Sequence, residues 1–221
     1  MLREYQIAFL SCLDRVTNLY EPVNEVIARL EPKKIVDIAT GSGESAIKAT
    51  EDVRKNGTEV VLTDKYPHEH LKEFTIQEID VLSNKLPEAN LYTMFNAFHH
   101  FDESQRLNIA LRATEKDSAF LVIEPLRPRI TIFIKVLIAT LIGPLLLAPF
   151  MRPFSWKWIL FTYIIPIGIL VTAWDGIASV IKSLNKDEWE NLEDELTTQG
   201  KSVEQGLLSS QFTRLKYFIV T

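Results

Sequence analysis

The chain has too few of the residues on which several common classes of protein depend. Cys12 is the only cysteine in 221 residues, which excludes an intrachain disulfide and a cysteine metal site and fits a reducing compartment. Cations are not in excess: 24 Lys and Arg against 29 Asp and Glu give a formal net charge of -5, whereas a nucleic-acid interface needs clustered cations. No Ser-His-Asp or Cys-His set for nucleophilic catalysis is visible, and we expect no metal site. The chain is 47% hydrophobic, enough to bury one substantial core.

A turn rich in small residues follows the first strongly apolar segment. The stretch KKIVDIATGSGESAIKA, residues 33–49, passes from β-branched residues into glycines and then resumes at helical spacing. Gly41 and Gly43 lack a Cβ, so the chain can turn tightly there and a ligand can approach its main chain. We therefore expect a strand, a glycine turn and the start of a helix.

Two kinds of ligand suit such a turn. Gly41, Gly43 and Ala46 fit the G-x-G-x-x-A dinucleotide fingerprint, and Asp64 follows at the spacing of a ribose-binding acid. Asp37, however, ends the strand just before the turn. Its carboxylate would repel a pyrophosphate but attract the ammonium group of a ligand that carries an amino acid. Asp37 therefore favours a ligand that carries an amino acid over a dinucleotide.

With Asp37 before the loop DIATGSG, the stretch resembles the first motif of the class I S-adenosylmethionine (SAM) methyltransferases. The resemblance continues in order over residues 33–125. TEVVLTD ends in Asp64, where the family has an acid that binds the ribose hydroxyls. FTIQEIDV ends near Asp80, where the family often has a polar residue close to the adenine amine. LYTMFNAFHHF matches the segment that faces the reacting methyl, and SAFLVIEP matches the fifth strand.

The resemblance implies an α/β fold with a doubly wound, Rossmann-like, mostly parallel sheet, and SAM as cofactor. Alternation of strands and helices in the sequence favours the same fold class. Carried onto this chain, the motifs imply cofactor contacts from residues at the strand ends and in the loops that follow. These are Asp37, Ala39, Thr40, Gly41, Gly43, Asp64, Lys65, Asp80, Val81, Asn96 and Ala97.

Four regions are expected along the chain. Residues 1–31 would form N-terminal helices, 32–126 the SAM-binding core, 127–184 an apolar helical insertion after the fifth strand, and 185–221 a helix and closing strands of the core. Charges interrupt the apolar residues of the N-terminus, so we do not expect a signal peptide there. Apolar residues at helical spacing predict one amphipathic helix over residues 7–19 and a second over residues 23–30. Either these helices simply pack on the sheet, or Tyr5 or Tyr20 contacts SAM or substrate.

The segment NAFHHF places two adjacent histidines at the predicted carboxyl end of the fourth strand, where open α/β sheets bind ligands. Neighbouring side chains in a strand point to opposite faces, so one of His99 and His100 would face the site. Such a histidine could act as general base toward a hydroxyl or phenol. We expect His99 in that role because it follows the strand more closely, the alternative being a positioned loop histidine.

The insertion is the least usual part of the sequence. Residues 130–151 and 156–174 each contain one charge, Lys135 and Lys157 respectively, and each approaches the length that crosses a bilayer. Breaks are expected near Gly143–Pro144 and at Pro166, because proline removes a helix hydrogen bond. Three hypotheses are open for residues 130–174: a lid over an apolar substrate pocket, a hairpin that dips into one leaflet, or the surface of a homodimer.

The insertion also resembles a segment of a bacterial subset of these methyltransferase-like proteins. The shared runs are Thr-Tyr-x-x-Pro and Trp-Asp-Gly-x-x-Ser, here Thr162, Tyr163, Pro166, Trp174, Asp175, Gly176 and Ser179. The subset usually has Arg where this chain has Lys182. Asp175 is expected either to cap a helix or to face substrate, and Tyr163 either to give its hydroxyl to the pocket or to anchor at an interface.

Together these features predict a SAM-dependent methyltransferase. The acceptor would be a small, largely apolar molecule, lipid-like or a natural-product intermediate, that receives the methyl group in line. One alternative is intramolecular displacement on SAM, which releases methylthioadenosine. Another is a membrane-associated binding module without turnover. We expect no nucleic-acid partner and a cytoplasmic location, with the insertion peripheral or monotopic on the inner face of the membrane.

Overall fold

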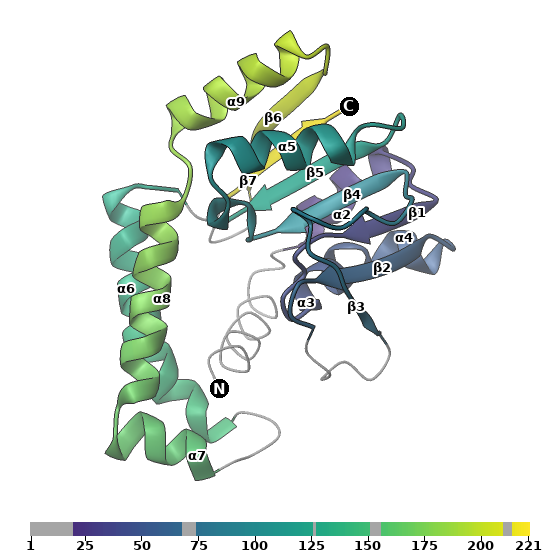
Figure 1. The fold of residues 1–221 in the computed structure, drawn as a ribbon. Coiled ribbons are helices and arrows are strands. Elements are labelled where there is room, and N and C mark those ends of the chain that lie inside the picture. The colour runs from purple at the N-terminus through teal and green to yellow at the C-terminus, as the bar shows by residue number, and fades with distance from the viewer. Residues whose placement is uncertain (1–19, 68–73, 126, 151–155, 210–213) are drawn as a thin grey trace. The chain divides into compact units, whose positions relative to one another are not determined.

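The computed structural model describes residues 20–67, 74–125, 127–150, 156–209 and 214–221 (Figure 1). These residues form two compact units. The core unit contains the described parts of residues 20–125 and 186–221, and the hairpin unit contains those of residues 127–185. The predicted helix over residues 7–19, with Tyr5, lies outside the described residues.

The core unit contains a seven-stranded sheet with strand order β3-β2-β1-β4-β5-β7-β6. Strands β1 to β5 are parallel, and β7 is antiparallel to both of its neighbours. The strands are β1 (Lys34–Asp37), β2 (Glu59–Asp64), β3 (Ile76–Glu78), β4 (Leu91–Phe95), β5 (Ala119–Glu124), β6 (Val203–Ser209) and β7 (Arg214–Val220). Every residue of β4 is buried, as expected for a central strand covered on both faces.

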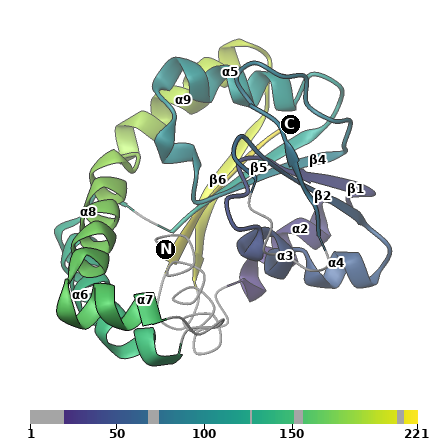
Figure 2. The same ribbon diagram turned by 60° about the horizontal axis from the view of Figure 1, so that its bottom comes forward.

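Helices cover both faces of this sheet. α5 (Glu103–Ala113) and α9 (Lys186–Thr198) lie on one face, and α2 (Glu21–Arg29), α3 (Glu44–Ala49) and α4 (Glu51–Lys55) lie on the other (Figure 2). α5 begins with a capping box in which the Asp102 side chain accepts from the Gln105 N–H. The predicted fold class, a doubly wound and mostly parallel sheet, is confirmed.

The strand order reverses direction next to β1, because β2 lies on one side of it and β4 on the other. Ligands of open α/β sheets bind outside the carboxyl ends of the strands at such a switch point. The carboxyl ends of β1, β2 and β4 therefore define where a site is expected.

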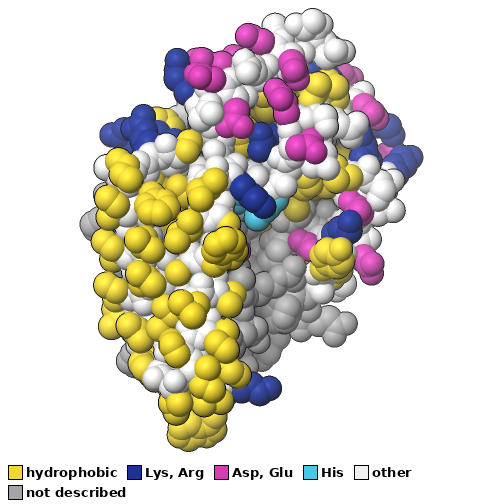
Figure 3. All heavy atoms as spheres, turned by 60° about the vertical axis from the view of Figure 1, so that its left-hand side comes forward, with side chains coloured by type: hydrophobic (Ala, Val, Ile, Leu, Met, Phe, Trp, Pro, Cys, Tyr) yellow, Lys and Arg dark blue, Asp and Glu magenta, His cyan; other side chains and the backbone are white. Residues whose placement is uncertain are grey.

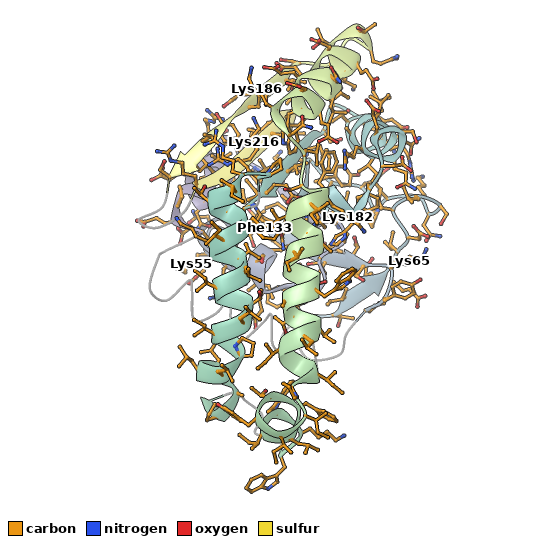
Figure 4. The ribbon with its side chains drawn as sticks, turned by 90° about the vertical axis from the view of Figure 1, so that its left-hand side faces the viewer. Lys55, Lys65, Phe133, Lys182, Lys186 and Lys216 are labelled. Atoms are coloured by element: carbon orange, nitrogen blue, oxygen red, sulfur yellow. The ribbon has the colours of Figure 1, made fainter. Side chains whose placement is uncertain are left out.

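The hairpin unit consists of two long helices and a short connection. It comprises α6 (Ile130–Leu147), a 3-10 turn (Ala148–Phe150), α7 (Trp156–Ile159), a π-helical turn η3 (Leu160–Ile164) and α8 (Ile167–Lys182). α6 and α8 run side by side (Figure 4). They approach closely at Gly176, where an added Cβ would lie 2.8 Å from Thr140 Cγ2 and 2.9 Å from Val136 Cγ1. The glycine of the Trp-Asp-Gly run thus serves helix packing.

One of the two predicted breaks is present and the other is not. The chain bends by 79° between η3 and α8 at Pro166, as predicted. The break at Gly143–Pro144 was wrong, since α6 continues through both residues. α6 is packed on both sides of Pro144, against Gly176 of α8 through Thr140 and against Tyr163 of η3 through Leu145. This packing offsets the hydrogen bond that proline removes. The second apolar segment also does not end at Trp174, because α8 continues to Lys182.

Candidate cofactor and catalytic site

Asp37 ends β1 as a nearly inaccessible carboxylate, with 1% of its surface exposed. Thr93 of β4 donates its hydroxyl to Asp37 Oδ1 at 2.6 Å, while Oδ2 has no hydrogen-bond partner among the described residues. Burial raises the pKa of Asp37 to about 7, an effect that the hydrogen bond from the Thr93 hydroxyl opposes only in part. Thr40 Oγ1 is likewise buried and unpaired in the described chain. Buried polar atoms without partners are costly, and a ligand with donor groups would satisfy them.

The turn after Asp37 adopts the left-handed backbone that small residues favour. Ala39, Gly41 and Gly43 have φ values of 54°, 59° and 78°. A Cβ added to Gly41 would meet no atom of the described residues within 4 Å, so among them the main chain is open there. The strain at Ala39, which is not glycine, fits a turn shaped for a ligand.

Asp64 ends β2 and holds this turn. Its Oδ2 accepts the Gly41 N–H at 2.8 Å, and its Oδ1 accepts the Tyr66 N–H at 2.8 Å. A carboxylate offers about four acceptor positions, so ribose hydroxyls can bind to it as well. The structure therefore brings together Asp37, Gly41 and Asp64, three of the predicted cofactor residues.

Three further predicted residues lie where β2 and β3 end. Lys65 forms a 2.9 Å ion pair with Asp80, which raises the pKa of Lys65 and lowers that of Asp80. Val81 is buried, and Arg112 of α5 donates to its carbonyl and to that of Asn84. The turn that contains Asp80 and Val81, which was predicted to lie near the adenine, is thus held in place by Lys65 and Arg112.

The segment after β4 differs from the prediction. The chain leaves the strand at Phe95, and Asn96, with φ 51°, donates its N–H to Ile123 O at 2.9 Å. Ala97 is buried and caps the 3-10 helix η1 (Phe98–His100). The expectation that His99 and His100 point to opposite sides of a strand was wrong, because their rings lie 4.3 Å apart in this helical turn.

His99 and Glu124 form a buried pair. His99 Nδ1 lies 3.0 Å from Glu124 Oε2, and the His99 main-chain N–H donates to Glu124 Oε1 at 3.2 Å. Both side chains are 2% exposed or less. Because a carboxylate only accepts, Nδ1 carries the hydrogen, which leaves the lone pair of a neutral ring on Nε2. His99 Nε2 is buried and has no partner among the described residues.

Other side chains fix the turn that carries His99. The Phe98 ring stacks on Trp189 of α9 at 5.8 Å and meets Phe120 of β5 edge-on at 6.0 Å. Arg106 of α5 donates from Nε to Phe98 O at 3.3 Å. Burial lowers the pKa of Arg106, against the opposing effect of nearby acids that include Glu188 and Glu124. η1 is therefore held from two helices and a strand.

The sequence pointed to neither Glu124 nor Thr93. Glu124 could have been found, since it ends the predicted fifth strand as Asp37 and Asp64 end the first and second. Thr93 carries no such signal, because a threonine inside an apolar strand is commonplace.

Tyr163 and Asp175, predicted as catalytic candidates, belong to the hairpin unit. The Tyr163 hydroxyl donates to Leu145 O, whose usual helix donor would be residue 149, a proline without an N–H. Asp175 lies in the middle of α8 and therefore does not cap that helix. The candidate site described above lies in the core unit and contains neither residue.

No protein-family model and no curated protein matches the chain, but solved structures do. The plantazolicin methyltransferase BpumL with S-adenosylhomocysteine (SAH) aligns with a TM-score of 0.59 and 11% identity, covering 96% of this chain and 88% of that one. Human N-acetylserotonin methyltransferase with SAM gives 0.56 and 15%, over 98% of this chain and 55% of that one. The methyltransferase domain of bacterial CtHen1 gives 0.54 and 12%, over 90% and 96%. The chain has the class I methyltransferase fold.

Proposed function

We propose that the protein is a SAM-dependent methyltransferase that methylates a hydroxyl or phenol of a small, largely apolar acceptor. One observation carries the proposal. Two buried polar atoms have no partner among the described residues: Asp37 Oδ2, in the last residue of β1, and His99 Nε2, in the turn after the adjacent strand β4. The first suits a cationic donor group, and the second suits a proton that must be removed.

The residues after β1 and β2 would hold the cofactor. Asp37 would bind the ammonium group of SAM, the bare main chain at Gly41 would lie against its amino-acid end, and Asp64 would accept from the ribose hydroxyls. When bound, SAM supplies an activated methyl group on its sulfonium. The protein then has to orient the acceptor, remove its proton and exclude water.

His99 is suited to take the proton. Glu124 fixes the ring through Nδ1 and can stabilise the imidazolium that forms when Nε2 accepts a proton. The anchoring of η1 by Phe98 and Arg106 keeps Nε2 in one position. Glu124, Phe98 and Arg106 act here as positioning residues.

The small size of the acceptor is supported by the similar structures. Phe98, Phe120 and Trp189 are buried in the core and hold the turn of His99 in place. BpumL is named for plantazolicin and the human enzyme for N-acetylserotonin, both small molecules. A small organic acceptor is the common element, and we extend it to this chain.

Turnover assays test the proposal. Native protein would be incubated with SAM and a panel of phenols, hydroxylated lipids and aromatic alcohols, with SAH and methylthioadenosine separated by chromatography. We expect SAH only when an acceptor is present. Release of methylthioadenosine would contradict methyl transfer and support intramolecular displacement on SAM. SAM binding without any product would indicate a binding module without turnover.

A further inference from the structure

The exposed apolar side chains of the described residues are concentrated on the hairpin unit. Of the twenty large hydrophobic side chains that are exposed, seventeen lie between Ile130 and Ile181. Trp156 and Trp174 are the most accessible, at 76% and 74%. Scattered single hydrophobic residues are ordinary on a protein surface, but a contiguous group of this size marks a binding surface.

Twelve of these seventeen side chains lie on the two long helices, and most of them recur at spacings of three or four residues. On α6 they are Ile130, Ile134, Ile138, Leu141, Ile142, Leu145 and Leu146, and on α8 they are Ile167, Leu170, Val171, Trp174 and Ile181. Other positions, such as Pro144, Ala173 and Val180, are buried. Figure 3 shows hydrophobic side chains forming a nearly continuous surface over the hairpin. We call this surface the apolar face.

The charge of the hairpin differs in sign from that of the whole chain. Residues 127–182 contain six Lys or Arg and one Asp, a net charge of +5, whereas the chain as a whole carries -5. Arg129 precedes α6 and Lys182 ends α8, so these cations lie at the same end of the antiparallel pair, where Figure 4 labels Lys182. Lys157 lies in α7, at the opposite end.

We propose that the apolar face docks on one leaflet of an anionic phospholipid bilayer, with α6 and α8 parallel to the membrane plane. An apolar surface bordered by cations matches acyl chains bordered by anionic headgroups. Exposed tryptophans at Trp156 and Trp174 suit the same boundary.

The distribution of charge decides the orientation. α6 is long and apolar enough to cross a membrane, and α7–η3 and α8 pass the same test as a bent pair. An end-on hairpin, however, would carry the charges of its tip and its middle into hydrocarbon, at about 2.5–3.5 kcal/mol for each charge at the centre. Lys135 and Asp175 lie well inside the helices, and Lys157 lies at the tip. In the face-on orientation, these side chains can reach the headgroups.

A second copy of the chain is a weaker candidate for the occupant. Two apolar faces packed against each other would bring two sets of cations together, with one acid per copy to oppose them. A bilayer that contains anionic lipid instead gains from cations at the ends of the helices such as Arg129 and Lys182, by about 1 kcal/mol each.

Vesicle flotation tests docking. The variant Ile138→Glu/Leu170→Glu changes two exposed residues of the apolar face, and the matched control Leu82→Glu/Leu207→Glu changes two exposed residues of the core unit. With vesicles of phosphatidylcholine and phosphatidylglycerol, we expect native protein and control to float and the bound fraction of the first variant to fall by about tenfold or more. Thermal unfolding of each variant establishes that it is folded.

Two results would overturn docking. One is failure of native protein to float with any vesicle. The other is a native dimer, seen by light scattering without lipid, that Ile138→Glu/Leu170→Glu converts to monomer while vesicle binding is unchanged.

Depth measurements test the orientation. In a Cys12→Ser background, Ile130→Cys, Ile138→Cys and Leu146→Cys place an environment-sensitive fluorophore along α6. Quenchers at known depths in the lipid then report the position of each label. Similar shallow depths at all three sites are expected, and a steady increase from residue 130 to residue 146 would show end-on insertion instead.

Discussion

Asp37 is a carboxylate in a position where negative charge is unfavourable without a ligand. Burial raises its pKa from 3.8 to about 7, so the native ligand-free protein holds a proton that the unfolded chain releases near pH 4. The free energy of unfolding of the ligand-free protein should therefore fall as pH rises from about 4 to 7, and Asp37 should contribute no further change above that range.

The same residue should make SAM binding depend on pH. An ammonium group favours the ionised form of Asp37, so we expect the affinity for SAM to rise from pH 5 to about 8 and then level off. Asp37→Asn should weaken binding and remove most of this dependence. Calorimetric titrations over that pH range measure both effects, and an unchanged slope in the variant would exclude Asp37 as the group responsible.

Removal of the proposed base should affect turnover more than binding. His99→Gln is expected to lower kcat by about 10²–10⁴-fold with little change in SAM affinity, because general-base catalysis contributes on that scale. The deficit should shrink as pH approaches the acceptor's own pKa, where no base is needed. Equal kcat in variant and native protein at neutral pH would show that His99 is not the base.

Glu124→Gln should give a smaller loss of the same kind, since an amide can offer its nitrogen to Nδ1 and stabilise the wrong tautomer. Glu88→Gln, an exposed acid paired with Lys116, is the matched control. If Glu124 acts through His99, Glu124→Gln should change the pH profile of kcat. If Glu124 only supports the fold, the substitution should lower kcat without altering that profile.

The sequence predicted the positions of some site residues and not those of others. The acids at strand ends, Asp37 and Asp64, were predictable because parallel strands bring their carboxyl ends to one edge. The turn of His99 was not, because alternation along a strand gives no indication of where the strand stops. Asn96, a residue that tolerates the left-handed conformation, was the one local sign that β4 ends there.

Among the elements, strands were easier to predict than breaks in helices. Buried strands are short apolar runs between glycines and acids, so β1, β2, β4 and β5 fall within the predicted segments. α6 contradicts a local rule, because proline at position 144 does not end it. The contacts with α8 and η3 that compensate come from residues far apart in the sequence, which a single-sequence pattern cannot reveal.

The close contact between α6 and α8 gives a prediction for the hairpin. Gly176→Ala would add a Cβ 2.8 Å from Thr140 Cγ2, and β-branched threonine has little freedom to move in a helix. We expect a net loss of about 1–2 kcal/mol, after the roughly 1 kcal/mol that alanine gains in helix propensity. Adding Thr140→Ser and Val136→Ala should restore part of the lost free energy of unfolding, as measured with denaturant. If the effects of the three substitutions simply add, the close contact at Gly176 is contradicted.

At the scale of the whole molecule, the two proposed functions reside in different units. Every residue of the candidate site belongs to the core unit, and every residue of the apolar face belongs to the hairpin unit. Ile138→Glu/Leu170→Glu should therefore bind SAM with native affinity, and Asp64→Asn should float with vesicles as native protein does. A loss of SAM affinity in the first variant would show that the two units are coupled.

The central claim is that the turn after β1 binds SAM, and calorimetric titration of native protein and Asp64→Asn with SAM and with NAD tests it most directly. We expect native protein to bind one SAM and no NAD. In Asp64→Asn the binding free energy should fall by about 1.5–3 kcal/mol, the usual value of a hydrogen bond to a charged group. NAD binding by native protein, or SAM affinity unchanged in Asp64→Asn, would contradict the account.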